Sequence, residues 1–174
     1  MNSPDSLWKR LDDNAERWML LGFYAMIVAT IVVEVVRRFV LSYSSIWGEE
    51  IARYAFIYLA WIGASSAIRE RAHIRIDVIL HYLGPRMKAA IYLFGDFATL
   101  TLAVIALYWS LEPILTSLKF GSVTHGLRIS NAWFLAAVPV GFAMMVFRLV
   151  QSILRDWGDF RAGRPVFEGA KLFD

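Results

Sequence analysis

The chain lacks cysteine, and histidine, proline and charged residues are scarce in it. Its 174 residues include no cysteine, 3 histidines, 5 prolines and 19% charged residues. Without cysteine there is no disulfide, no thiol nucleophile and no thiolate metal site. No histidine lies inside a long apolar run, which excludes a bis-histidine haem, and no Gly-rich phosphate-binding loop occurs. We therefore expect neither an enzyme nor a protein with a cofactor of its own.

Hydrophobic residues, in contrast, are abundant. They make up 58% of the chain, and the charges cluster between long apolar runs. In lipid a spanning segment must satisfy its own backbone hydrogen bonds, so such runs predict helices. The fold class expected is all-α, a single membrane domain over residues 1–174. The net charge of +3 is modest and the basic residues lie between the apolar runs, which argues against a nucleic-acid partner.

Four apolar runs are long enough to cross a hydrocarbon core of about 30 Å as helices. The predicted spans cover residues 18–36, 49–68, 89–111 and 130–154. Glu112 and Pro113 are expected to end the third span, with another turn or two of helix extending beyond the membrane.

The start and the course of the fourth span also carry local signals. Ser130 or Asn131 is expected to cap its first turn, because both are good N-cap residues. Pro139, with Gly141 close by, predicts a kink inside this span.

The segments outside the spans carry further signals. Residues 73–83 alternate apolar and polar groups and predict a short amphipathic helix on the membrane surface, in contact with lipids. Residues 155–174 read as a polar tail. The segment before the first span lacks the basic region and cleavage site of a signal peptide, so we expect that span to be retained.

The distribution of basic residues predicts the orientation. The N-terminus, residues 69–88 and the C-terminal region hold thirteen of the 18 lysines and arginines, and the opposite side holds five. Cytoplasmic loops are enriched in basic residues. Both termini are therefore expected in the cytoplasm, with residues 112–129 on the outer side.

The second span is flanked by the densest polar groups of the chain. Glu49 and Glu50 precede Arg53 by four and three residues, a spacing that favours an intrahelical ion pair. Trp61 lies deep in the span. Gly63 and Ala67 have the spacing that lets helices approach closely in lipid.

The span is followed by a polar run that holds Arg69, His73 and Asp77. On a helix, His73, Asp77 and His81 would share one face. The stripe from His73 to His81 covers about 12 Å, which is too long for one metal ion to touch both ends. A polar face toward another chain is the interpretation preferred here.

Two acids lie inside spans, and an acid at membrane depth is a functional hypothesis by default. Glu34 has Arg37 and Arg38 three and four residues later, so an ion pair near the interface is favoured. Asp96 is the most deeply placed acid. It is either a proton or ion relay or, as we prefer, one end of a hydrogen bond to another helix.

The stretch WGEEIARYAFIYLAWIGASSAIRERAHIRIDVI resembles the small membrane subunit (DctQ type) of tripartite ATP-independent periplasmic (TRAP) transporters. The resemblance rests on the Glu-Glu pair with Arg53, the run that starts at Trp61, and the Arg-x-x-x-His-Ile-x-x-Asp pattern from Arg69 to Asp77. AVPVGFAMM in the fourth span is similar to the last helix of that family.

The resemblance implies a bacterial or archaeal inner-membrane protein that packs on the scaffold of a large elevator-type membrane subunit. That partner would carry the sodium and substrate sites, and a periplasmic binding protein would deliver an organic acid. The implied interface or structural residues are Glu49, Glu50, Arg53, Trp61, Gly63, Ala67, Arg69, His73 and Asp77. No residue of this chain is implied to bind substrate, cofactor or metal.

Two other interpretations stay open on the sequence. One is an autonomous proton-coupled exporter that acts as a homodimer, with Glu34 or Asp96 as the proton-carrying carboxylate. The other is a protein that organises lipids or assemblies through residues 73–83.

Overall fold

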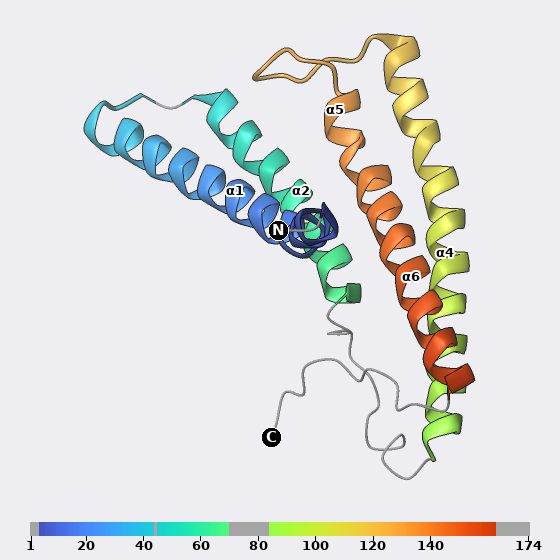
Figure 1. Ribbon diagram of the computed structural model, residues 1–174. Helices are drawn as coiled ribbons and strands as arrows, with labels where there is room; N and C mark the ends of the chain where they lie inside the picture. Colours follow the sequence, from blue (N-terminus) through green and yellow to red (C-terminus); the bar gives the residue numbers. More distant parts are fainter. Residues whose placement is uncertain (1–3, 44, 70–83, 163–174) are drawn as a thin grey trace. The chain divides into compact units, whose positions relative to one another are not determined.

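The structure, a computed structural model, describes residues 4–43, 45–69 and 84–162 (Figure 1). Within these ranges the chain forms helices α1 (Pro4–Val40), α2 (Ile46–Arg69), α4 (Pro85–Phe120), α5 (Ala132–Leu135) and α6 (Ala137–Ala162). The described part contains no strand, only an isolated bridge between Val123 and Ser130. The predicted all-α fold class is confirmed.

Four stretches of the described helices are long and apolar enough to cross a membrane, which confirms the predicted set of four. They are Asn14–Val40, Ile46–Ile68, Met87–Phe120 and Ala132–Arg161. Each is longer than predicted. Residues 155–162 of the predicted polar tail belong to α6. The predicted amphipathic helix at 73–83 and the end of the tail lie outside the described residues.

The third spanning helix does not end at Pro113. Proline lacks the N–H that would bond to the fourth residue before it, yet α4 continues for two more turns to Phe120. It ends at Gly121, which has a φ of 60°. The Ser122 N–H donates to the Ser117 carbonyl at 3.1 Å and the Gly121 N–H donates to the Leu118 carbonyl at 3.3 Å, which is a Schellman cap. The expected extension beyond Pro113 is confirmed.

The fourth span is interrupted one turn before Pro139. α5 ends at Leu135 and α6 begins at Ala137. Pro139 has no N–H for the Leu135 carbonyl, and its ring crowds that carbonyl, so the break falls there. At the start of the span, the Ala132 N–H donates to the Ser130 hydroxyl at 3.3 Å, whereas the Asn131 side chain makes no capping bond.

The chain divides into two compact units, residues 1–63 with 110–138 and residues 64–109 with 139–174. In the second unit a small core of Ile68, Ala103 and Leu149 is buried. Ser152 of α6 donates a hydrogen bond of 2.8 Å to Asp96 of α4, and both side chains are buried. The preferred interpretation of Asp96, a hydrogen bond to another helix, is confirmed.

Replacing Leu149 by alanine should destabilise the second unit by about 2 kcal/mol or more, because a buried leucine leaves a cavity that its neighbours fill only in part. Leu149 is 2% exposed, and Leu154 on the same helix is 69% exposed. Thermal unfolding of the purified protein in detergent checks this. Leu154→Ala is the matched control, and an equal loss in both variants would contradict the assigned core.

Candidate functional site at the polar end of α1 and α2

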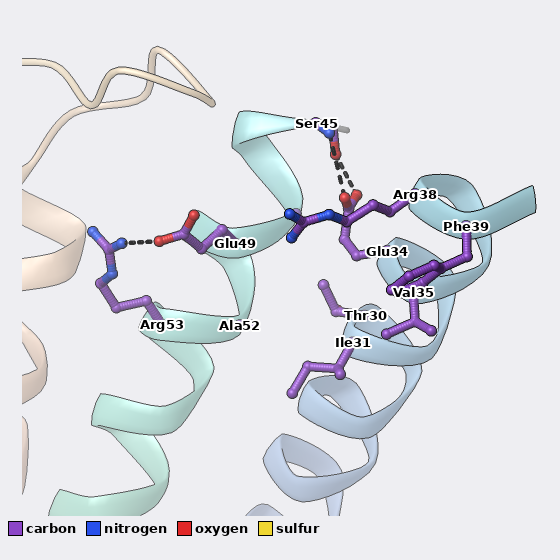
Figure 2. Close-up of a pocket in the computed structure, with 11 residues that line it drawn as sticks. Thr30, Ile31, Glu34, Val35, Arg38, Phe39, Ser45, Glu49, Ala52 and Arg53 are labelled. Atoms are coloured by element: carbon purple, nitrogen blue, oxygen red, sulfur yellow. Dashed lines mark hydrogen bonds and ion pairs between the residues drawn. The ribbon is translucent and has the colours of Figure 1, made fainter. Parts of the chain in front are cut away.

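The connection from α1 to α2 is organised around Glu34. Its carboxylate accepts a hydrogen bond from the Ser45 hydroxyl and another, at 3.3 Å, from the Ser45 N–H (Figure 2). Arg37, one turn further along α1, forms an ion pair with the same carboxylate at 3.5 Å. The predicted pairing of Glu34 with a nearby arginine is thus confirmed for Arg37. A carboxylate with these partners holds the two helices at a fixed turn.

Arg37 is also enclosed by aromatic rings. Its guanidinium carbon lies 4.9 Å from the ring centroid of Tyr43 and 5.1 Å from that of Trp47. Each contact is a cation–π interaction. The Leu41 and Tyr43 N–H groups both donate to the Arg37 carbonyl at 3.1 Å, so the turn itself is hydrogen-bonded. Tyr43 and Trp47 therefore help to hold this arginine at the turn.

Glu50, near the start of α2, contacts a distant loop rather than the α1–α2 connection. Its carboxylate accepts hydrogen bonds from the N–H groups of Leu127 at 2.6 Å and Gly126 at 3.1 Å, in the loop between α4 and α5. Its other oxygen accepts the Tyr54 hydroxyl at 2.9 Å. This carboxylate fastens a loop that lies 76 residues away in the sequence.

The loop approaches α2 so closely that a side chain at residue 126 would be crowded. A β-carbon there would lie 2.7 Å from the Glu50 carboxylate oxygen and 3.0 Å from the Cα atom of Trp47. The second of these is a backbone atom that cannot turn aside. Two further contacts hold the same elements together: Tyr58 donates to the Trp133 carbonyl at 2.7 Å, and the Tyr54 and Phe134 rings lie 4.9 Å apart.

Glu49 and Glu50 are neighbours in sequence but not in role. Glu49 pairs with Arg53 at 2.5 Å, and both side chains are largely exposed. The predicted intrahelical pair is confirmed for Glu49. Glu50 points instead to the loop, and no periodicity within α2 signals that choice. Exposed ion pairs of this kind contribute little to stability.

The other predicted residues of the second span are placed as follows. Trp61 and Ala67 are half-buried. A β-carbon on Gly63 would meet a methyl group of Leu20 of α1 at 3.8 Å, so this glycine lies beside a helix of its own chain. Arg69 is the last residue of α2. His73 and Asp77 lie outside the described residues, and their assigned roles stay predictions.

The exposed residues of α2 after its first turn form one stripe. Between residues 49 and 67 they are Glu49, Arg53, Phe56 and Ala60. Steps of four, three and four residues keep these positions on one face of a helix, and the same register continues to Gly63 and Ala67. We call these six positions the α2 stripe. It combines an ion pair at one end with an aromatic ring and small residues along the span.

An open pocket of about 460 Å³ lies between α1 and α2 next to the Glu34 turn (Figure 2). Apolar side chains of α1 form one wall, and Arg38, Glu49 and Arg53 stand at its rim. No cluster of three or more potential metal ligands occurs among the described residues. The charged groups that line the pocket are suited to polar and ionic recognition.

Comparisons with known proteins identify similar sequences over most of the chain. A family model described as "Tripartite ATP-independent periplasmic transporters, DctQ component" matches residues 27–159. The chain is 26% identical over 145 residues to the sialic acid TRAP transporter small permease protein SiaQ of Vibrio cholerae, which covers 83% of each chain.

Two longer proteins are also similar. The chain is 29% identical over 149 residues to the isethionate TRAP transporter permease protein DctMQ of Oleidesulfovibrio alaskensis, which covers 82% of this chain and 24% of that protein. It is 24% identical over 137 residues to the sialic acid TRAP transporter permease protein SiaT of Haemophilus influenzae, which covers 79% of this chain and 22% of that protein. The chain therefore spans about a quarter of the length of each.

Removing the Glu50 carboxylate should free the α4–α5 loop, whereas removing Glu49 should not. In Glu50→Ala the N–H groups of Gly126 and Leu127 lose their acceptor, and their hydrogen exchange should become at least about tenfold faster. Glu49→Ala is the matched control, since it removes the same charge one residue away. Equal exchange in the two variants would contradict the loop-fastening role.

Proposed function

The chain belongs to the DctQ component family of TRAP transporters, and on that premise we propose that it helps to take up an organic acid across the inner membrane. It is a multi-pass small permease subunit that works with a large permease subunit, and it is a transporter component rather than an enzyme. In the proposed complex the large subunit couples transport to sodium and binds the substrate. A periplasmic binding protein delivers that substrate.

The family match over residues 27–159 is the observation that carries the proposal. The two longer relatives support a large partner, because each is named a permease and only about a quarter of its length is similar to this chain. The described residues fit a subunit that provides a surface, since the carboxylates of Glu34, Glu50 and Asp96 are engaged in contacts within the chain. Asp96, the proton carrier in the exporter alternative, accepts the Ser152 hydroxyl, which favours a structural role.

The α2 stripe is the proposed docking face for the large subunit. Helix association in lipid relies on close packing of small residues and on anchoring aromatic side chains. Phe56 is 60% exposed in this chain, and Ala60 beside it is exposed as well. Of the residues implied by the resemblance, Glu49, Arg53, Gly63 and Ala67 belong to the stripe. Glu50 contributes indirectly, by fixing the loop.

A larger side chain at Ala60, the exposed small residue of the α2 stripe, should weaken the complex with the large subunit. Ala60→Leu pushes a docked helix away, so the yield of large subunit that co-purifies with the tagged chain should fall by roughly half or more. Ala90→Leu makes the same substitution at an exposed position of α4 and is the matched control. A loss in the control with a normal yield for Ala60→Leu would move the interface to α4 and leave the family assignment intact.

The proposed orientation, with both termini in the cytoplasm, is testable because the chain has no cysteine. Val123 is 58% exposed in the α4–α5 loop, and a β-carbon on Gly84, just before α4, would meet no atom within 4 Å. In intact spheroplasts a membrane-impermeant maleimide should label Val123→Cys. It should label Gly84→Cys only after lysis. The reverse pattern would invert the topology.

A further inference from the structure

The pocket between α1 and α2 contains an arginine that the contacts described so far do not use. Arg38 lines the pocket, is exposed, and extends from α1 toward α2 in Figure 2. Within the described residues it has neither a hydrogen bond nor an ion pair. Its neighbour Arg37, by contrast, is engaged by Glu34 and by two aromatic rings. Adjacent arginines thus have separate roles, and only Arg37 holds the turn.

Among the charged residues around the pocket, Arg38 is the one that no carboxylate of the pocket balances. Glu34 is paired with Arg37 and hydrogen-bonded to Ser45. Glu49 is paired with Arg53. Each carboxylate therefore has a cation of its own, and the pocket with its immediate partners carries one net positive charge. A guanidinium with free donors suits a phosphate, which it can bind through two parallel hydrogen bonds.

The wall beside Arg38 is apolar and faces outward. Ile31, Val35 and Phe39 line the pocket and are 50%, 48% and 79% exposed. They occupy the last turns of the apolar stretch that ends at Val40. Tyr43 and Trp47, residue types enriched at membrane interfaces, follow at once in the chain. An arginine above an apolar wall at the end of a span lies where a lipid headgroup meets its acyl chains.

We propose that this pocket binds a membrane phospholipid, with its phosphate on the Arg38 guanidinium and one acyl chain along Ile31 and Val35. The charge of the pocket selects the phosphate, and the exposed apolar wall selects a lipid over a free anion. The site lies wholly within the first compact unit. The lipid would lie next to the Glu49–Arg53 end of the α2 stripe.

The test measures lipid binding to the full-length chain, purified with its large partner, by native mass spectrometry with added phosphatidylglycerol. Arg38→Gln should weaken one lipid site about tenfold, since it removes a charge-assisted contact. Arg17→Gln is the matched control. It removes an equal charge from an exposed position of the same helix, about 31 Å away, and should leave that site unchanged.

Two further variants keep the test decisive if Arg38→Gln fails to fold. Arg38→Lys keeps the charge but loses the two parallel hydrogen bonds, so its binding should lie between that of wild type and that of Arg38→Gln. Ala52→Phe fills the pocket without changing any charge and should lose the binding. Wild-type binding in Ala52→Phe or in Arg38→Gln would overturn the proposal. So would equal losses in Arg38→Gln and Arg17→Gln, which would indicate diffuse attraction.

Two other occupants give distinct results that also overturn the proposal. Displacement of the lipid by millimolar inorganic phosphate would indicate an anion site. Loss of the large subunit from Arg38→Gln with lipid binding unchanged would indicate an acidic group of that partner on Arg38.

Discussion

The Glu50 carboxylate is the contact on which the arrangement of the first unit depends. It is the point where α2, the Tyr54 side chain and the α4–α5 loop meet, through three hydrogen bonds to one charged group. Bonds to an ionised acceptor are stronger than those between neutral groups. The loop, in turn, lies so close to α2 that a side chain at residue 126 would be crowded. The charge of Glu50, at the start of a span, thus holds the α4–α5 loop against α2.

Other acidic side chains of the described residues also have hydrogen-bond partners within the chain. Asp96 and Ser152 satisfy each other between α4 and α6, and Glu34 joins α1 to the start of α2. Polar groups are costly at membrane depth. Because these acids bind partners within the chain, they do not add exposed charge to the outer helix faces, which stay apolar. Such faces suit lipid and a larger membrane protein. The α2 stripe and the Arg38 pocket both combine charged groups with such faces.

The sequence was sufficient to predict the number of spans and the ion pairs between residues three or four positions apart. Run length predicts the four spans, and spacings of three and four residues predict the pairs Glu34–Arg37 and Glu49–Arg53. It could not indicate that Glu50 binds a loop 76 residues away, because no local pattern encodes that approach. The sequence did predict that this helix continues past Pro113, but it did not indicate where the helix stops: α4 tolerates one missing hydrogen bond at Pro113 and ends at the left-handed Gly121.

The length of α4 determines how far the α4–α5 loop lies from the hydrocarbon core of the membrane. Its candidate spanning segment, Met87–Phe120, has 34 residues and measures about 51 Å along the axis. A hydrocarbon core of about 30 Å, crossed at a steep tilt of about 40°, accommodates only about 39 Å of it. Some two turns must therefore project, and Glu112 and Lys119 place that surplus at the end before the loop. The excess length of α4 therefore places the loop beyond the acyl chains, together with the first turn of α2, which Glu50 joins to the loop.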